Sequence, residues 1–165
     1  MSGSAMTRVV HHRMAENRRV LLVSSTGGHW VQMRRLEPAF SGWSIHWACT
    51  DPGHKQSVPH PDRFHACPEA SQWSKIRLVW QALAVAMVLV RVRPAVVVST
   101  GASVGYFAIV LGKVFGARTI WLDSIANVDE LSLSGRMAGR FADLWLTQWE
   151  SLSKPGGPVF MGSVV

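Results

Sequence analysis

Two short segments of small residues carry the side chains that could do chemistry in this sequence. The first is Thr26-Gly27-Gly28-His29 and the second is Thr100-Gly101-Ala102-Ser103, and each follows an apolar run. Glycine at such a turn lets the backbone approach a ligand, and the backbone N–H groups at a helix start attract phosphate. His29 adds a group that can donate to phosphate or accept a proton near neutral pH. The alternative is a plain strand-to-helix turn with a surface histidine.

Three further residues follow apolar runs and are candidates for ligand contact. Asp123 could bind sugar hydroxyls or act as a base, or it could simply cap a turn. Gln148 and Trp149 end the last run, where the indole could stack on a sugar, contact another chain or lie at the edge of the core. The first segment does not fit G-x-G-x-x-G, because Ser24 and Thr26 stand where a dinucleotide site needs glycine. A nucleotide-cofactor enzyme is therefore the weakest of the functions considered.

The composition narrows the classes of partner. The 165 residues carry a formal net charge of +7, which favours anionic partners such as phosphorylated ligands or an acidic membrane face. The basic residues are spread along the chain without a dense run, so we predict no nucleic-acid partner. Cys49 and Cys67 match neither a zinc spacing nor a disulfide framework, which predicts a reduced, cytoplasmic setting and no metal. Residues 1–18 lack the apolar core of a signal peptide and are predicted to form a flexible basic leader.

Strand and helix patterns alternate through residues 19–165, which we predict to form a single domain. The expected strands are Arg19–Ser24, Ser44–Thr50, Ala95–Ser99, Arg118–Asp123 and Asp143–Gln148, and the expected helices are Trp30–Phe40, Trp73–Val92, Ser103–Phe115 and Leu133–Phe141. Ser103 and Ser132 can cap the last two helices. Such alternation predicts an α/β fold, a Rossmann-like doubly wound parallel sheet that binds ligands at the carboxyl ends of its strands. That edge receives the loops Ser24–His29, Thr50–His54, Thr100–Ser103 and Asp123–Asp129.

The apolar segment Leu78–Val90 has two interpretations. Its 13 uncharged residues are too few to cross a bilayer as a helix, which takes about 20. It is either a buried core helix or a helix partly sunk in a membrane interface. In the second case Lys75, Arg77, Arg91 and Arg93 would lie near the lipid headgroups.

Four segments together resemble a known family. They are Ser25-Thr-Gly-Gly-His29, Pro94-Ala-Val-Val-Val-Ser-Thr-Gly101, Leu131-Ser-Leu-Ser-Gly-Arg136 and Ala142-Asp-Leu-Trp-Leu-Thr-Gln-Trp149. Their order resembles the asparagine-linked-glycosylation-fourteen family, and the bacterial PssD-like subunits of exopolysaccharide assembly look closer still. The resemblance covers about residues 19–162. It implies the N-terminal, acceptor-side half of a GT-B glycosyltransferase, encoded as a separate chain.

The resemblance also implies roles for the candidate residues. His29 and then Asp123 would be the catalytic candidates, although many relatives have glutamate at the aspartate position. The acceptor diphosphate would contact six residues in the two small-residue segments: Thr26, Gly27, Gly28, Thr100, Gly101 and Ser103. Gln148 and Trp149 would lie toward the partner subunit.

These roles predict a subunit of a membrane-associated glycosyltransferase. It would transfer a sugar from a UDP-sugar to a polyprenyl-diphosphate-linked saccharide, without a metal or other cofactor, in exopolysaccharide or capsule biosynthesis. A separate donor-binding subunit would complete the enzyme, and the chain would lie in the cytoplasm, peripheral on the inner face of the cell membrane. The alternative is a noncatalytic membrane anchor that presents the acceptor and recruits the catalytic subunit.

Overall fold

The computed structural model of the chain describes residues 18–71 and 73–164, so the predicted basic leader, apart from Arg18, lies outside the described residues. The described residues form a seven-stranded sheet in the order β3-β2-β1-β4-β5-β6-β7. Every neighbouring pair is parallel. The strands are β1 (Arg19–Ser24), β2 (Ser44–Cys49), β3 (Phe64–Ala66), β4 (Val96–Ser99), β5 (Arg118–Leu122), β6 (Leu144–Thr147) and β7 (Val159–Phe160). This is the Rossmann-like α/β sheet that the sequence predicts.

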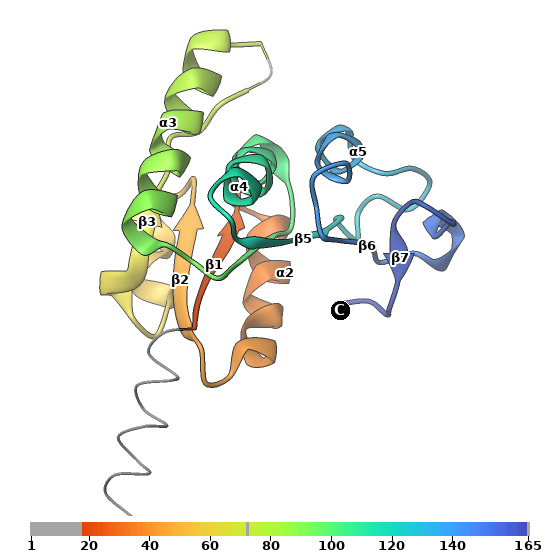
Figure 1. Cartoon of the computed structure of the whole chain (residues 1–165), viewed down its shortest axis with the longest axis horizontal. Coiled ribbons are helices and arrows are strands. Elements are labelled where there is room, and N and C mark those ends of the chain that lie inside the picture. The colour runs from red at the N-terminus through yellow and green to blue at the C-terminus, as the bar shows by residue number, and fades with distance from the viewer. Residues whose placement is uncertain (1–17, 72, 165) are drawn as a thin grey trace, which may run out of the picture.

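Helices cover the two faces of the sheet unequally (Figure 1). One face packs against α3 (Lys75–Val92), α4 (Ala102–Val114) and α5 (Leu133–Ala138). The other face packs against α2 (Gly28–Leu36). Four short 3₁₀ helices lie in the connections: η1 (Glu37–Phe40), η2 (Pro52–Ser57), η3 (Pro61–Arg63) and η4 (Glu150–Leu152). The central strands are apolar on both faces because both are covered.

The strand order reverses between β1 and β4. From β1 the chain proceeds outward to β2 and β3, then returns through α3 to β4 on the other side of β1. The carboxyl ends of the two strands at such a reversal leave a crevice in which open α/β sheets bind their ligands. The loops that follow β1 and β4 are the two small-residue segments, so the topology brings them to one place.

The helix ends differ from the predicted ones for local reasons. The helix expected at Trp30–Phe40 begins earlier, at Gly28, and its last turn is the 3₁₀ helix η1, because Pro38 has no N–H to donate. Ser132 caps α5 as predicted and accepts a hydrogen bond from the Gly135 N–H at 2.8 Å. Ser103 does not cap α4, which starts one residue before it with Gly101 at the cap position. The capping prediction for Ser103 was therefore wrong.

Helix α3, which contains the Leu78–Val90 segment, has one buried side and one exposed apolar side. Its inner side packs into the core through buried residues that include Val85 and Leu89. Its outer side exposes apolar side chains to solvent, among them Ile76, Trp80 and Met87 with exposed fractions of 74%, 64% and 70%. The helix is thus a core helix on one side and an uncovered apolar surface on the other.

Candidate functional site

The turn after β1 leaves the start of α2 open. Gly27, at the cap position, has φ 70° and ψ −137°, and no side chain caps the helix. The first N–H groups of α2 therefore have no capping side chain, and they carry the positive end of the helix dipole. A Cβ atom added at Gly27 or Gly28 would meet nothing within 4 Å. These glycines leave an open approach to the backbone, as an anion-binding turn requires.

The turn after β4 repeats this arrangement beside the first. Gly101 caps α4 with φ 149° and ψ −176°, a conformation open essentially to glycine alone, and again no side chain caps the helix. Ala102, the next residue, has φ 64°, a strained value for a residue with a Cβ atom. Backbone strain of this kind gathers at ligand sites. Two uncapped helix starts thus lie at the switch between β1 and β4.

His29 is fixed between the two turns. Its Nδ1 lies 2.8 Å from the backbone oxygen of Thr100, and the Thr100 hydroxyl donates to the backbone oxygen of His29 at 2.8 Å. A carbonyl oxygen only accepts, so Nδ1 must carry the proton, and Nε2 then holds the lone pair. The imidazole is half-buried, and within residues 18–71 and 73–164 its Nε2 has no hydrogen-bond partner. A ring held in this tautomer can accept a proton through Nε2.

Asp123 occupies a different environment from His29. Its exposed fraction is 1%, and its carboxylate accepts hydrogen bonds from four donors. Oδ1 accepts from Trp121 Nε1 at 3.1 Å and from the Ser132 hydroxyl at 2.6 Å, while Oδ2 accepts from Asn127 Nδ2 at 3.1 Å and from the Ser132 N–H at 2.9 Å. The carboxylate therefore ties the end of β5 to the start of α5. Its hydrogen bonds hold the loop between β5 and α5.

The two residues predicted to lie toward a partner, Gln148 and Trp149, make hydrogen bonds within the chain. Gln148 is buried, with its Nε2 donating to Gln32 Oε1 at 2.8 Å and to the Asp123 backbone oxygen at 2.9 Å. Its Oε1 accepts from the Val164 N–H at 2.8 Å. Trp149, which is half-buried, donates from Nε1 to the Ile125 backbone oxygen at 2.8 Å. The Gln148 side chain thus holds the C-terminal segment by internal hydrogen bonds, and the position of the Gln148–Trp149 segment toward a partner subunit stays a prediction.

Ser103 is also directed away from the turns, because its hydroxyl donates to the Ala70 backbone oxygen at 3.3 Å. Gly101-Ala102-Ser103-Val104-Gly105 has the G-x-S-x-G spacing of a serine hydrolase elbow. In that elbow the serine itself sits at the strained turn, whereas here Ala102 has the positive φ and Ser103 lies inside α4. Its hydroxyl bond to Ala70, not to an imidazole, argues against a nucleophilic serine.

The two cysteines are not nucleophile candidates either. Cys49 ends β2 on the ligand edge, and burial raises the pKa of its thiol. Burial likewise raises the pKa of Cys67 to about 11. Both side chains are therefore thiols at neutral pH, and the thiol is the unreactive form.

A second histidine lies on the other side of the Gly27–Gly28 turn and was not among the predicted site residues. His54, in η2 after β2, has its Nε2 3.3 Å from the Thr26 hydroxyl. Its ring stacks on Trp30 with centroids 4.5 Å apart and an interplanar angle of 9°. The only signal in the sequence was the place of the Thr50–His54 loop after a strand, because the loop has no motif of its own.

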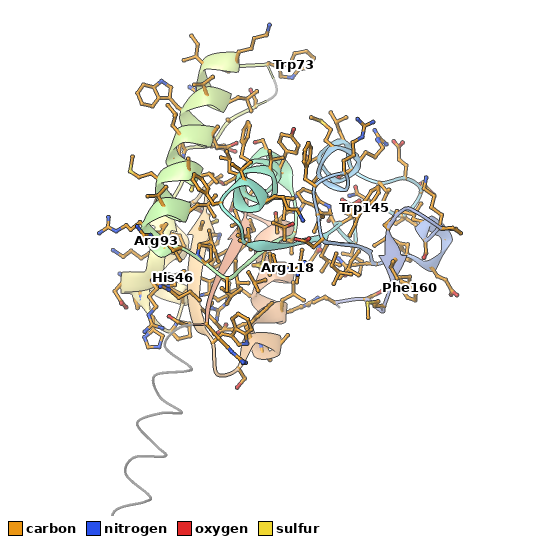
Figure 2. All side chains as sticks on the ribbon, in the orientation of Figure 1. His46, Trp73, Arg93, Arg118, Trp145 and Phe160 are labelled. Carbon is orange, nitrogen blue, oxygen red and sulfur yellow. The ribbon has the colours of Figure 1, made fainter. Side chains whose placement is uncertain are left out.

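Basic residues flank the exposed apolar surface of α3. We call this surface the α3 outer face and define it by Ile76, Trp80, Leu83, Met87 and Val90, whose spacing places them along one side of the helix. Lys75, Arg77, Arg91 and Arg93 lie at its two ends, and Figure 2 shows Trp73 and Arg93 at opposite ends of the helix. Among the described residues no helix is both long and apolar enough to cross a membrane.

Comparisons with known proteins place this chain in a family. A family described as "Oligosaccharide biosynthesis protein Alg14 like" matches residues 63–161, more than half of the chain. The crystal structure of MurG from Acinetobacter baumannii is similar with a TM-score of 0.70 at 11% sequence identity. That match covers 87% of this chain and 45% of the MurG chain, so this chain spans less than half of MurG's length. No curated protein matches the sequence.

The family and the fold agree with the resemblance in the four sequence segments. The family match connects the chain with oligosaccharide biosynthesis, and the similarity to MurG shows a shared fold. The chain belongs to the Alg14-like family of oligosaccharide biosynthesis proteins.

Proposed function

We propose that this chain is the acceptor-side subunit of a membrane-associated glycosyltransferase. It transfers a sugar from a UDP-sugar to a polyprenyl-diphosphate-linked saccharide in exopolysaccharide or capsule biosynthesis. A separate chain supplies the donor-binding half, as the resemblance in the four sequence segments implies. The observation that carries the proposal is the imidazole of His29, fixed between two uncapped helix starts at the strand switch.

The two helix starts would hold the acceptor diphosphate. N–H groups of α2 and α4 would donate to its oxygens, with Thr26, Gly27, Gly28 and Gly101 forming the backbone cradle. Thr100 contributes by fixing His29 rather than by direct contact, because its hydroxyl is already bonded to the His29 backbone oxygen. A diphosphate is a stronger match to this site than a neutral sugar, since both helix dipoles present their positive ends.

His29 would act as the general base in the transfer. The acceptor hydroxyl gives its proton to Nε2 while its oxygen attacks the anomeric carbon of the donor sugar. The bond from that carbon to the UDP oxygen breaks, and UDP leaves with the electron pair. We assign Asp123 to a positioning role, since its four hydrogen bonds leave the carboxylate engaged inside the protein. Transfer is proposed to need no metal, and chelation by EDTA is then expected to leave the rate unchanged.

The α3 outer face would hold the subunit at the membrane where its substrate resides. Exposed tryptophan and aliphatic side chains enter the interface while the flanking lysine and arginines meet anionic headgroups. Basic groups near such a surface contribute about 1 kcal/mol each. This supports a peripheral location on the inner face of the cell membrane, in the cytoplasm.

The membrane role is tested by sedimentation with vesicles of phosphatidylglycerol and phosphatidylcholine. Trp80→Glu is expected to weaken binding at least about tenfold, because it removes apolar area and adds a charge that anionic lipid repels. Val159→Glu makes the same kind of change at an exposed residue of β7 and serves as the control. Equal binding of both variants and the wild-type chain would refute the assignment of this surface.

The catalytic role is tested by sugar transfer with the donor-side chain present. We expect His29→Ala to lower the rate by about 10²- to 10⁴-fold, the usual contribution of a general base. His60→Ala, at an exposed histidine outside the site, is the control. Unchanged transfer by His29→Ala would favour the alternative of a noncatalytic anchor, and full transfer without any second chain would refute the two-subunit proposal.

A further inference from the structure

His54 and His29 flank the Gly27–Gly28 turn from opposite sides. The turn follows β1, whose neighbours in the sheet are β2 and β4. His29 is bonded to Thr100 after β4, and His54 comes from η2 after β2 and contacts Thr26. The start of α2 is therefore bordered by an imidazole on each side, although the proposed function uses only the one beside β4.

The ring of His54 is held in one orientation before any ligand arrives. One face stacks on Trp30, which is itself buried, so the plane of the ring is fixed. The Asp51 carboxylate lies 3.7 Å from His54 Nε2, and this favours the tautomer with the proton on that nitrogen. The same nitrogen is 3.3 Å from the Thr26 hydroxyl, a long hydrogen bond that a better acceptor can replace.

A phosphate oxygen is such an acceptor. A ligand on the first N–H groups of α2 would lie beside Thr26, a residue exposed to solvent. A hydrogen bond to a charged oxygen is shorter and about twice as strong as one between neutral groups. The orientation of His54 is already fixed, so little conformational entropy is lost when the bond forms.

We propose that His54 is a ligand-binding residue that donates from Nε2 to the diphosphate on the β2 side of the turn. This inference rests on the proposed function, because it names a further contact to the same anion. It gives the two histidines separate tasks. His29 has its lone pair on Nε2 and accepts a proton. His54 has its proton on Nε2 and donates it in a hydrogen bond to the negatively charged diphosphate.

The test is isothermal titration calorimetry of the whole chain with inorganic pyrophosphate. His54→Phe keeps a ring to stack on Trp30 but removes the donor, and we expect about tenfold weaker binding, the effect of losing one hydrogen bond to a charged group. His54→Gln returns an N–H donor and is expected to recover most of the affinity. His60→Phe, a matched change in the same connection between β2 and β3, is expected to bind as the wild-type chain does.

The outcomes separate this inference from the proposed function. Wild-type affinity in His54→Phe, with an unchanged melting temperature, overturns the role of His54 and leaves the anion site intact. A wild-type chain that does not bind pyrophosphate overturns the anion site itself and the role of His54 with it. The wild-type chain also gives a readout that no folding defect can disturb. The imidazole ¹⁵N resonances of His54 should move on titration while those of His60 stay, and fixed His54 resonances would overturn the inference.

Discussion

The substitution Gly101→Ala should disable His29 without replacing it. A Cβ atom at residue 101 would lie 2.5 Å from His29 Nδ1 and 3.0 Å from Nε2, well inside contact distance. The imidazole must then swing away, and its hydrogen bond to the Thr100 backbone oxygen breaks. The site keeps its histidine but loses the tautomer and the orientation that make Nε2 a base.

The cost in stability follows from two contributions. A residue with a Cβ atom at φ 149° and ψ −176° costs on the order of 1–3 kcal/mol. The lost hydrogen bond adds about 1 kcal/mol. The free energy of unfolding should therefore fall by about 2–4 kcal/mol, which lowers the melting temperature by roughly 5–15 °C for a chain of this size.

The assay is sugar transfer at a temperature at which the variant is still folded. We expect a loss of about 10²-fold or more, as for removal of a general base. Gly42→Ala is the matched control, because Gly42 also has a positive φ, of 81°, but a Cβ atom there would meet nothing within 4 Å. It should lose about 1 kcal/mol and keep its activity. If Gly101→Ala transferred sugar at the wild-type rate, the fixed imidazole would not be the base.

Three further changes test the packing and the charges around this site. Asp123→Asn presents an amide N–H to donors that need an acceptor, so urea denaturation should show a loss of about 2–4 kcal/mol. Burial and the neighbouring His65 imidazole lower the pKa of His46 to about 4, and burial lowers that of His65. Between about pH 6.5 and pH 4 the unfolded chain therefore binds more protons than the folded chain. The contribution of these histidines to the free energy of unfolding is fully present above about pH 6.5 and is lost as the pH falls toward 4. His46→Phe should flatten this loss in pH-dependent melting curves. The hydrogen bond from Lys113 lowers the pKa of Asp143 to about 2, so the destabilisation caused by Lys113→Met should shrink as acid unfolding is followed from pH 4 to pH 2.

The sheet and the edge at which the two turns lie were predictable because the signals for them are local. Uninterrupted apolar runs marked β1, β4 and β5, and the small residues after β1 and β4 marked the turns. Parallel strands place all their carboxyl ends at one edge, so the two turns had to share it. The strands β3 and β7 were missed because they contain three and two residues, too few for any alternation to show.

The side-chain partners at that edge were not predictable, because they join residues far apart in the chain. Gln148 looked like a surface residue after a strand, yet it bonds to Gln32, 116 residues away. Ser103 looked like a helix cap, but Gly101 at the cap position moves the helix start one residue earlier. A polar residue after a strand can face the ligand or the interior, and only the surrounding elements decide which.

The contrast between His29 and Asp123 shows a difference in their surroundings that the sequence could not reveal. Both follow apolar strands at the ligand edge, and both can accept a proton. The buried Asp123 carboxylate accepts hydrogen bonds from four donors within the protein. The His29 imidazole donates from Nδ1 to the Thr100 backbone oxygen, and this bond fixes the direction of the ring. Its Nε2 is then available for the proposed proton transfer. A base needs both a fixed direction and an unused lone pair, and of the two residues His29 alone has both.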